Sequence, residues 1–561
     1  MDRRDRHCAE QFRARHSQAW GEVRRTSLNE RQTESGTTGS HRFGIGRCAL
    51  GEIVSGDRRI STTELGLRAA KAATALDSVG VKPGDIIALF LRNDVPFFEA
   101  SMAAGILGVY PTPANWHATP EEARYILENS GAKVLVIHSD LYEGIKAAIP
   151  AGVNVFTVQT PVEIAEAYGL APQPTAAPAG ARDWSSWIDG FAPWSGEVRP
   201  NPGTIIYTSG TTGHPKGVRR ASPTQEQYDA SMRGLVTIFG LTTRPPDQIV
   251  SVMVGPMYHS APNAYGMVAA RIGATLHLQA RFDPEDLLRM IQDLRITHIH
   301  MVPIMFNRLL KLPEDVKRKY DLSSLEFVVH AAAPCPAPVK RAMIEWWGPV
   351  INEYYGSTET GGVVFCTSDQ WLSHPGTVGK AQPGADVRVT DADGNSLPLG
   401  EVGEVCARFL NIADFTYHKD DAKRQATAKV GLIATGDLGY FDTDGFLYLC
   451  DRSKDMIISG GVNIYPAEIE GVLHRMTGVA DCAVFGVPDD EYGEAVHACV
   501  QAQPDVSLSE EDVKAYLRDH LSGYKVPRSV DFRAELPRED SGKIFKRKLR
   551  EPFWAGRTTR I

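Results

Sequence analysis

The chain has 561 residues, which favours about three or four folding units, or fewer if one of them is a large α/β body. Hydrophobic residues make up 43% of the sequence and charged residues 23%, so a sizeable core can be buried, and a disordered or collagen-like chain is excluded. The 60 basic and 68 acidic residues leave a formal net charge of -8, which disfavours nucleic acid as a partner because no positive field attracts a phosphate backbone.

The cysteines and the apolar runs indicate a cytoplasmic protein. The 8 cysteines include no CxxC pair, which argues against a zinc ribbon and against a disulfide framework and fits a reducing compartment. A long uncharged stretch, residues 100–120, contains Pro111 and Pro113 as well as Asn115 and His117, whose polar groups would be stranded in lipid. We therefore expect no transmembrane segment.

Residues 1–45 form an N-terminal polar extension that we expect to be disordered. The segment is rich in arginine, with Asp2, Asp5 and Glu10 among the basic residues, and it shows little hydrophobic periodicity. It lacks the apolar run of a secretory signal, and its acidic residues make a transit peptide the weaker alternative.

From about Ile45 onward, short β-branched and apolar runs alternate with helical patterns, which predicts parallel strands in βαβ units and an α/β fold. A helix is expected over 119–132, since Pro120 and two glutamates fall in its first turn and Gly131 closes it. The expected strands cover residues 86–91, 134–138, 249–254, 275–278 and 327–330.

Two changes in composition divide the rest of the chain. Residues 168–203 are rich in Pro, Ala, Gly and Trp and show no clear period, so we expect a long surface excursion there. Near Asp451 a strand-like run gives way to a polar segment, after which the chain carries its own β and α patterns. We therefore predict an N-terminal domain over 46–451 and a small α+β C-terminal domain over 452–561.

The strongest motif is the run Thr204–Val218, in which a short β pattern leads into a loop of glycines and hydroxyls. Glycines let backbone N–H groups approach an anion closely, hydroxyls donate further hydrogen bonds, and Lys216 adds the positive charge that a triphosphate needs. The loop is not a Walker A sequence, because Lys216 is followed by glycine rather than by Ser or Thr. Composition alone leaves an ordinary flexible turn as the alternative.

A second run, Asn352–Val363, places a tyrosine, hydroxyls and a carboxylate close together in the sequence. Tyr355 can stack on a base, Thr358 can donate to a phosphate, and Glu359 can hold Mg²⁺, which prefers one or two carboxylates plus phosphate oxygens. Taken alone, the run also fits a β-turn with a buried tyrosine and a solvated glutamate.

Three more runs follow toward the C-terminus. In Ala434–Cys450, a buried carboxylate at Asp437 can accept hydrogen bonds from ribose hydroxyls. In Asp451–Gly471, Pro466 favours the start of a helix.

The last run, Leu536–Glu551, contains Lys543 in a Ser-Gly turn ahead of a basic helix. The solvated face of that helix is expected to carry its basic residues, which are Lys546, Arg547, Lys548 and Arg550.

In this order, the five runs resemble the adenylate-forming superfamily of acyl-CoA synthetases, nonribosomal peptide adenylation domains and beetle luciferases. The resemblance covers roughly residues 48–551, and five motifs in order are far more specific than any one of them. It implies a large N-terminal body of α/β subdomains, a small mobile C-terminal lobe after a hinge, and an active site between them.

The resemblance also implies catalytic and moving parts. Lys543 would be the lysine for adenylation, Thr358 would contact the α-phosphate, and Glu359 would hold Mg²⁺. His259 would lie beside the acyl carboxylate. The hinge would be Lys454, and the CoA tunnel would be lined by Gly460 and Gly461.

The same resemblance assigns a nucleotide site. Tyr355 would stack on the adenine, next to a wall of small residues at 331–334, and Asp437 and Arg452 would grip the ribose. The implied nucleotide-binding residues are Thr208, Ser209, Gly210, Thr211, Thr212, Gly213, Lys216, Ala332, Ala333, Tyr355, Gly356, Asp437 and Arg452.

The implied reaction has two halves. A carboxylate attacks the α-phosphorus of ATP and pyrophosphate leaves, and the thiol of CoA then displaces AMP from the acyl-adenylate. The substrates would be ATP, CoA and a small carboxylic acid, with Mg²⁺ as the cofactor. An amino-acid substrate is disfavoured, because no Asp lies near Tyr258–Ser260 to pair with an ammonium group. The alternative of another class is a non-catalytic nucleotide-binding scaffold, against which Lys543 and Glu359 argue.

The acid itself is expected to be hydrophobic, with a medium- or long-chain fatty acid as the first choice. An aromatic acid or a cyclic or steroid side-chain acid is the alternative with the same chemistry, because glycines leave the depth of the pocket open. The sequence leaves the oligomeric state open, with a homodimer as one candidate assembly. The residues expected to line the acyl pocket, each of which also fits an ordinary core, are Tyr258, Val302, Phe306, Gly361 and Gly362.

Overall fold

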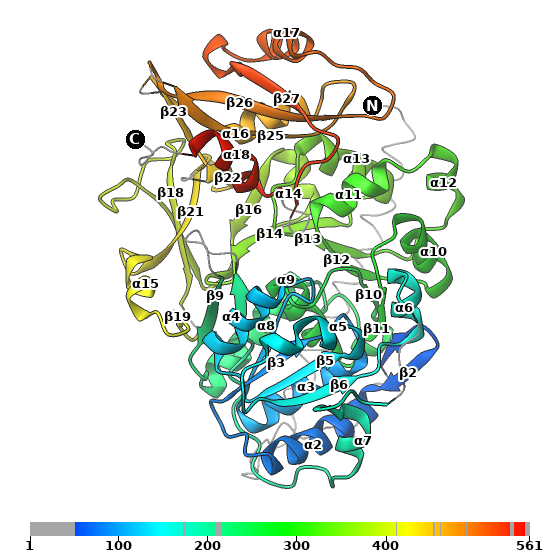
Figure 1. The fold of residues 1–561 in the computed structure, drawn as a ribbon. Coiled ribbons are helices and arrows are strands. Elements are labelled where there is room, and N and C mark those ends of the chain that lie inside the picture. The colour runs from blue at the N-terminus through cyan, green and yellow to red at the C-terminus, as the bar shows by residue number, and fades with distance from the viewer. Residues whose placement is uncertain are drawn as a thin grey trace, which may run out of the picture. The chain divides into compact units, whose positions relative to one another are not determined.

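The structure is a computed structural model that describes residues 51–171, 176–208, 215–410, 412–452, 455–460, 462–489, 491–538 and 544–555. Figure 1 shows these ranges as a ribbon and labels many of their helices and strands. The predicted polar extension, residues 1–45, lies outside the described residues. Among the helices that the structure describes, none combines the length and the apolar character needed to cross a membrane.

The first sheet is parallel throughout and carries helices on both faces. Its order is β4 (Tyr110–Pro113), β3 (Ile86–Phe90), β5 (Val134–His138), β6 (Asn154–Val158) and β7 (Arg182–Asp183). The helices that follow its strands or precede them are α2 (Thr62–Ser78), α3 (Val95–Leu107), α4 (Pro120–Ser130), α5 (Ser139–Ile145), the 3₁₀ turn η1 (Lys146–Ala148), α6 (Val162–Tyr168) and α7 (Trp184–Asp189).

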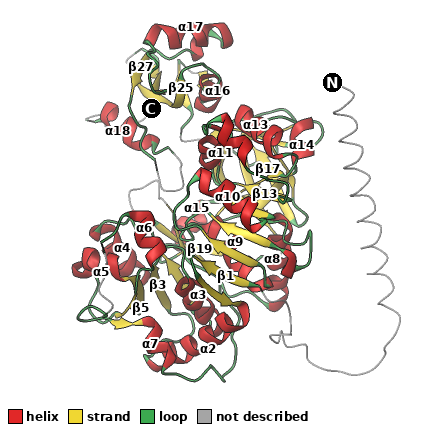
Figure 2. Ribbon diagram, turned by 90° about the vertical axis from the view of Figure 1, so that its right-hand side faces the viewer, coloured by secondary structure: helices red, strands yellow, loops and turns green. Residues whose placement is uncertain are grey.

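Alternate side chains of these strands point to opposite faces of the sheet and pack in two separate hydrophobic cores. Ile87 and Val136 pack in one cluster with residues of α2 and α3, whereas Ala88 and Ile137 pack in another with residues of α4 and α5. Figure 2 shows these helices on either side of the strands. The α/β prediction and the strands expected at 86–91 and 134–138 are confirmed.

The helix expected over 119–132 is α4. Thr119 and Glu122 form a capping box at its start, and Gly131 ends it with φ of 68°. Pro120 with the two glutamates at the start and Gly131 at the end, the signals that the sequence offered, therefore mark the two ends of this helix.

The long sheet begins with parallel strands. In order they are β1 (Glu52–Ser55), β11 (Thr275–Leu278), β10 (Val250–Met253), β12 (His298–Met301), β13 (Phe327–His330) and β14 (Ile351–Ser357), with β2 (Arg58–Ser61) antiparallel to β1 at the edge. These positions confirm the strands expected at 249–254, 275–278 and 327–330. The helices between them are α8 (Gln225–Ile238), the turn η2 (Pro246–Gln248), α9 (Ser260–Ile272), α10 (Pro284–Leu294), α11 (Pro303–Leu310), α12 (Glu314–Lys319) and α13 (Ala337–Trp347).

Beyond β14 the long sheet becomes antiparallel. It continues through β15 (Gly361–Cys366), β16 (Thr377–Ala381), β22 (Leu447–Arg452), β21 (Leu432–Phe441), β18 (Gly403–Phe409) and β17 (Ala385–Thr390), with β20 (Ala428–Lys429) paired to β21 and α14 (Ser368–Ser373) between β15 and β16. A separate small sheet has the order β19 (Phe415–Tyr417), β9 (Lys216–Arg220) and β8 (Ile206–Thr208), and α15 (Asp421–Ala426) follows it.

The C-terminal lobe is α+β, as expected. Its sheet contains β24 (Val462–Ile464), β23 (Ile457–Ser459), β26 (Gly493–Ala502) and β25 (Val479–Asp489), and β27 (Ser529–Phe532) pairs with β26 in parallel. Its helices are α16 (Pro466–Leu473), α17 (Glu510–His520), the turn η3 (Gly523–Lys525) and α18 (Lys546–Trp554). Pro466 stands at the start of α16, as predicted.

Two sequence expectations are wrong. The segment 168–203 is not all surface, because Trp184 of α7 is fully buried and its Nε1 donates to Glu99 Oε2 at 2.8 Å. Lys546 is not on a solvated face, because its Nζ lies 2.8 Å from Glu470 Oε1 and its side chain is only 19% exposed. In both cases a polar partner far along the chain provides the contact.

Candidate active site

The two ends of the predicted phosphate loop are held together by a hairpin. Thr208, the last residue of β8, pairs with Lys216, the first residue of β9, and its Oγ1 donates to the Lys216 carbonyl at 3.5 Å. Ser209, Gly210, Thr211, Thr212 and Gly213 lie outside the described residues.

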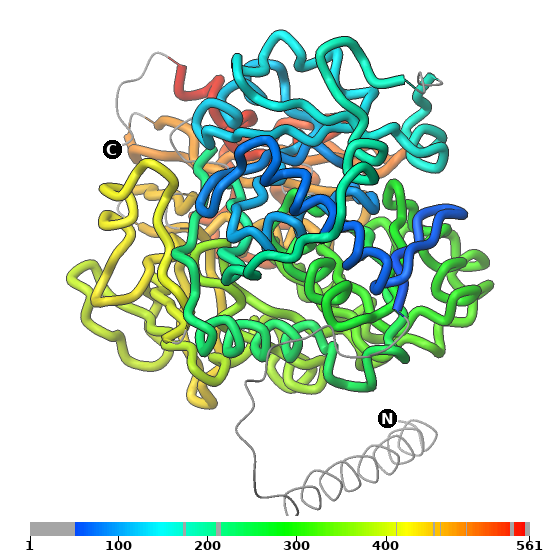
Figure 3. Tube along the Cα trace, turned by 90° about the horizontal axis from the view of Figure 1, so that it is seen from below, coloured from blue at the N-terminus to red at the C-terminus, as the bar shows by residue number. Residues whose placement is uncertain are grey.

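Tyr417, a residue that the sequence analysis did not predict for the site, lies near both Lys216 and Glu359. The Lys216 Nζ lies 5.9 Å from the centroid of the Tyr417 ring, and the Tyr417 hydroxyl donates to Glu359 Oε1 at 3.0 Å. Burial raises the pKa of Tyr417, and the Glu359 carboxylate raises it further, so this hydroxyl stays protonated as a donor. Tyr417 reaches the site because β19 pairs with β9, although the two strands come from distant parts of the chain (Figures 1 and 3).

Arg220 fixes the backbone that carries Glu359. Its Nη2 donates to the carbonyls of Thr358 and Glu359 at 3.0 and 2.7 Å, and its Nη1 donates to the carbonyl of Ala413 at 3.0 Å. One guanidinium therefore joins β9, the turn after β14 and the segment before β19.

Thr358 lies against the start of α9. Its Oγ1 donates to Ser260 Oγ at 3.1 Å, and Ser260 is the first residue of that helix. His259 occupies the N-cap position immediately before it, with its ring 4.4 Å from the ring of Tyr258. The hydroxyl expected to contact the α-phosphate and the residue expected beside the acyl carboxylate are therefore neighbours.

The backbone before His259 is held by two asparagines that sequence reasoning missed. Asn93 donates to the Gly255 carbonyl and accepts from the Met257 N–H, both at 2.8 Å, and Asn263 donates to the Met257 carbonyl at 3.0 Å. The position of Asn93 just past β3, at the carboxyl end of a parallel strand, was the available signal.

Tyr355, Asp437 and Arg452 meet as the resemblance implied. The Tyr355 hydroxyl donates to Asp437 Oδ2 at 2.7 Å and to Thr435 Oγ1 at 3.1 Å, while Arg452 Nε lies 3.2 Å from Asp437 Oδ1. Asp437 and Arg452 face each other in the β21–β22 register. Burial raises the pKa of Tyr355 well above its ordinary value, with the Asp437 carboxylate adding to the rise.

Gly356 is required by a close approach of two backbones. A Cβ on this residue would lie 1.8 Å from the carbonyl oxygen of Gly361 on β15, where a bulge interrupts the β14–β15 register. No other residue type fits at this point without moving the turn that carries Glu359.

Ala332, in the wall expected beside the adenine, has φ of 74°, in the left-handed region. This conformation costs an alanine about 1–2 kcal/mol, and a glycine there gives back about 0.4–1 kcal/mol through unfolded-state entropy. We expect Ala332→Gly to raise the free energy of unfolding by about 0.5–1 kcal/mol in denaturant titrations. The matched variant Ala333→Gly, at a position without positive φ, should lower it. Equal changes in the free energy of unfolding for the two variants would show that the backbone of Ala332 is not strained.

On the acyl side, Gly362 faces a cluster of aromatic side chains. A Cβ on Gly362 would lie 2.9 Å from the Tyr354 ring and 3.1 Å from Ile238. The Tyr354 hydroxyl lies 3.2 Å from His300 Nε2, and Phe239 packs on both rings. Burial lowers the pKa of His300 to about 4, so the wall is uncharged at neutral pH.

The remaining predicted residues lie elsewhere or outside the described ranges. Val302 and Phe306 are buried in the core around α11, with the Phe306 ring edge-on to His330. Gly460, in the lobe, has φ of 57°. Lys454, Gly461 and Lys543 are outside the described residues.

Comparisons with known proteins identify the family of the chain. The AMP-binding enzyme family matches residues 41–414, and the AMP-binding enzyme C-terminal domain matches residues 468–543. A 3-[(3aS,4S,7aS)-7a-methyl-1,5-dioxo-octahydro-1H-inden-4-yl]propanoyl:CoA ligase from Mycobacterium tuberculosis is 36% identical over 89% of this chain and 95% of its own length. The long-chain-fatty-acid CoA ligase FadD13 of the same species is 30% identical over 89% of this chain and 94% of its own length.

Among solved structures, ATP-bound MatB from Rhodopseudomonas palustris superposes with a TM-score of 0.78 at 27% identity, over 90% of this chain and 96% of that one. The match thus runs through both the large body and the small lobe. The chain belongs to the AMP-binding enzymes of the adenylate-forming superfamily and is an acid:CoA ligase of the AMP-forming type.

Proposed function

We propose that the nucleotide is bound where Lys216, Tyr417 and Glu359 meet, with Tyr355 and Asp437 beside it, and that this site adenylates a hydrophobic acid. The contact of Tyr417 with both Lys216 and Glu359 carries the proposal, because it unites the phosphate loop with the acidic turn. Two anions, a carboxylate and ATP, must meet there, so positive charge and donors are needed to offset their repulsion.

The residues present fit a magnesium ion. Glu359 has one oxygen occupied by the Tyr417 hydroxyl and a second oxygen in the same carboxylate, and Mg²⁺ takes one or two carboxylates plus phosphate oxygens. When bound, the ion would neutralise charge that grows on the phosphates. The Thr358 hydroxyl, next to Ser260, is positioned to donate to the α-phosphate.

The test is the first half-reaction measured alone. Exchange of labelled pyrophosphate into ATP should require both Mg²⁺ and an acid, and the complete reaction with CoA should release AMP. Release of ADP, or ATP binding without exchange for any acid tested, would contradict the proposal.

For the acid, the aromatic wall behind Gly362 favours a compact ring-bearing acid. Tyr354, Phe239 and His300 pack on one another behind Gly362, and uncharged aromatic faces suit a ring or fused rings. The relative at 36% identity is named for an indene-based propanoate, which belongs to this class.

A medium- or long-chain fatty acid is the second candidate, because a long-chain ligase is also a relative. A panel of saturated fatty acids, aryl-propenoic acids and fused-ring propanoates, assayed for AMP release with CoA, separates the two classes. Highest kcat/KM for a long saturated chain would overturn the preference for a ring.

Substitution at Gly362 tests which side chains line the pocket. We expect Gly362→Ala to lower kcat/KM for the preferred acid by about 10-fold or more, since one methyl group in a pocket is worth about 1–3 kcal/mol. The KM for ATP should not change. Gly234→Ala on α8, where a Cβ meets nothing within 4 Å, is the matched control. An unaltered kcat/KM for the acid in Gly362→Ala would show that the acyl pocket lies elsewhere.

The division of the chain stays a proposal. We place the N-terminal domain at 46–451 and a mobile C-terminal domain at 452–561, with the hinge at Lys454, the CoA tunnel along Gly460 and Gly461, and Lys543 as the adenylation lysine. A cytoplasmic location and a homodimer complete the proposal.

A further inference from the structure

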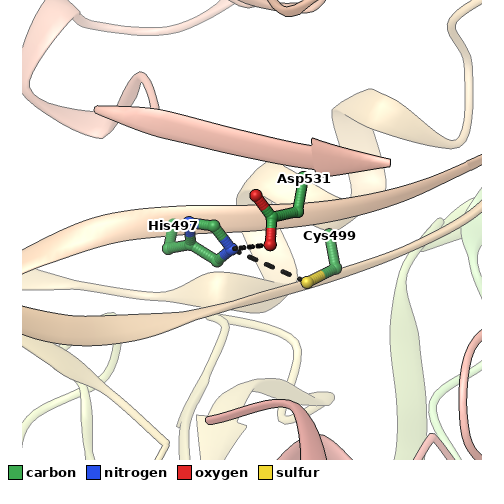
Figure 4. A group of neighbouring side chains, drawn as sticks. All are labelled: His497, Cys499 and Asp531. Atoms are coloured by element: carbon green, nitrogen blue, oxygen red, sulfur yellow. Dashed lines mark hydrogen bonds and ion pairs between the residues drawn. The ribbon is translucent and has the colours of Figure 1, made fainter. Parts of the chain in front are cut away.

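Three potential metal ligands form a cluster in the C-terminal lobe, shown in Figure 4: His497, Cys499 and Asp531. β26 and β27 pair in parallel with Cys499 opposite Asp531 and His497 opposite Ser529. Side chains alternate along a strand, so His497 and Cys499 share one face of β26. The cluster shares no residue with the candidate active site.

The spacing of the ligand atoms is close to that around a tetrahedral ion. His497 Nε2 lies 3.7 Å from Cys499 Sγ and 3.9 Å from Asp531 Oδ2, and the three ligand atoms all lie within 4.8 Å of one another. Ligands bound at zinc distances of about 2.0–2.3 Å lie about 3.3–3.6 Å apart, so shifts of about half an ångström would close the site.

The imidazole is oriented for this role by its other nitrogen. His497 Nδ1 lies 2.7 Å from Ser529 Oγ, and when Nδ1 carries the proton the Nε2 lone pair faces Cys499 and Asp531. The neutral imidazole is the form that binds a metal ion through this lone pair. Phe485 and Phe553 pack on the ring at centroid distances of 5.1 and 4.7 Å.

The charges around the cluster are compatible with a divalent cation. Arg533 Nη2 lies 3.4 Å from Asp531 Oδ2, and both side chains are about half exposed. On binding an ion, the Cys499 thiol would release its proton to solvent. A thiolate and a carboxylate then neutralise a dication, and Arg533 faces no net positive charge.

We propose that His497, Cys499 and Asp531 bind Zn²⁺ with water as the fourth ligand, and that the ion joins β27 to β26. Thiolate and imidazole together select zinc over magnesium, which prefers an all-oxygen shell. The Asp531 side chain is 45% exposed, which leaves the fourth position open to solvent.

The test uses the full chain, stripped of metal and titrated with Zn²⁺ against a chromophoric chelator. We expect one equivalent to bind. Losing even an outer partner of a ligand typically costs about 10–100-fold in metal affinity, so His497→Gln, Cys499→Ser and Asp531→Asn should each weaken binding at least tenfold, and Ser529→Ala by about tenfold. Asp531→Asn is isosteric and half exposed, so it should retain the fold.

Two controls distinguish this site from adventitious zinc. Cys482→Ser removes a buried thiol of the same lobe, and His374→Gln removes the histidine of an exposed cluster with Asp442 and Asp444. Neither should alter binding. The proposal would be overturned if zinc binding were undetectable. It would also be overturned if His374→Gln lost affinity for zinc while the variants of His497, Cys499 and Asp531 retained it. The Cys499–His497 contact would then be a hydrogen bond only.

Cobalt provides an independent readout of the ligands. Co²⁺ in place of zinc should give a thiolate-to-cobalt charge-transfer band that Cys499→Ser abolishes and Cys482→Ser retains. A band that persists in Cys499→Ser, or a spectrum of octahedral cobalt, would contradict the site.

Discussion

Glu359→Gln is expected to lower the rate of acid-dependent pyrophosphate exchange by about 10²–10³-fold, the typical cost of removing one preorganised group that stabilises transition-state charge. Glutamine keeps the shape of the side chain and can still accept from the Tyr417 hydroxyl, so the fold should survive. What is lost is the negative charge that holds Mg²⁺. Raising the Mg²⁺ concentration should therefore recover part of the rate.

Tyr417→Phe is the matched control for this experiment. It keeps the carboxylate and removes one hydrogen bond, worth about 0.5–1.5 kcal/mol, so exchange should fall only about 2–10-fold. If Glu359→Gln exchanged pyrophosphate at the wild-type rate at a low Mg²⁺ concentration, the ion would be held by other groups.

Lys340→Met is expected to lower the free energy of unfolding by about 3–5 kcal/mol, because it leaves a buried carboxylate without its partner. The Lys340 side chain is fully buried and the Glu353 side chain 8% exposed, with Nζ 2.5 Å from Oε2. His330 Nε2 lies 3.6 Å from the same oxygen, but burial holds the pKa of His330 well below its ordinary value, so it does not replace the ammonium.

The pH dependence of this loss has a definite sign. Burial raises the pKa of Glu353 and Lys340 opposes the rise, so removing Lys340 raises it further. A carboxyl whose folded pKa exceeds its unfolded value favours the folded state at low pH and loses that advantage as pH rises. The loss of unfolding free energy in Lys340→Met should therefore become smaller as the pH falls below the raised pKa of Glu353. Denaturant titrations at several pH values measure it.

The double variant Lys340→Met, Glu353→Met provides the control, since replacing both partners by apolar groups is often neutral. It should recover most of the stability. The pair also joins α13 to β14, where Glu353 pairs with His330 of β13, just before the wall expected beside the adenine, and lies two residues before Tyr355. Lys340→Met should therefore also raise the KM for ATP. Unfolding like that of the wild type would mean that the charges are hydrated.

The elements that the sequence predicted well are those whose signals are local. Residues 86–91 and 134–138 are continuous apolar runs, and α4 carries both a capping box and a terminal glycine. Trp184 and Lys546 were misplaced because their partners, Glu99 and Glu470, are brought to them only by the fold.

The candidate site divides in the same way. Tyr355, Asp437 and Arg452 come from motifs, and the register of β21 with β22 brings the last two together. Tyr417, Arg220 and Asn93 have no motif around them, and only the pairing of β9 with β19 and the ends of parallel strands bring them to the site. The pairing of strands that are distant along the chain is the feature that a single sequence indicates least.

Under the proposed function, two adjacent residues of strand β14 face the acid on one side of the sheet and ATP on the other. Tyr354 packs with the core around Phe239 and Tyr265, whereas Tyr355, its immediate neighbour, packs with the core that contains Val363 and Val405. The choice of acid can thus diverge on one side of the ribbon while the handling of ATP stays unaltered on the other. A designer who wishes to graft a new acid preference onto this scaffold can confine the changes to the Tyr354 side.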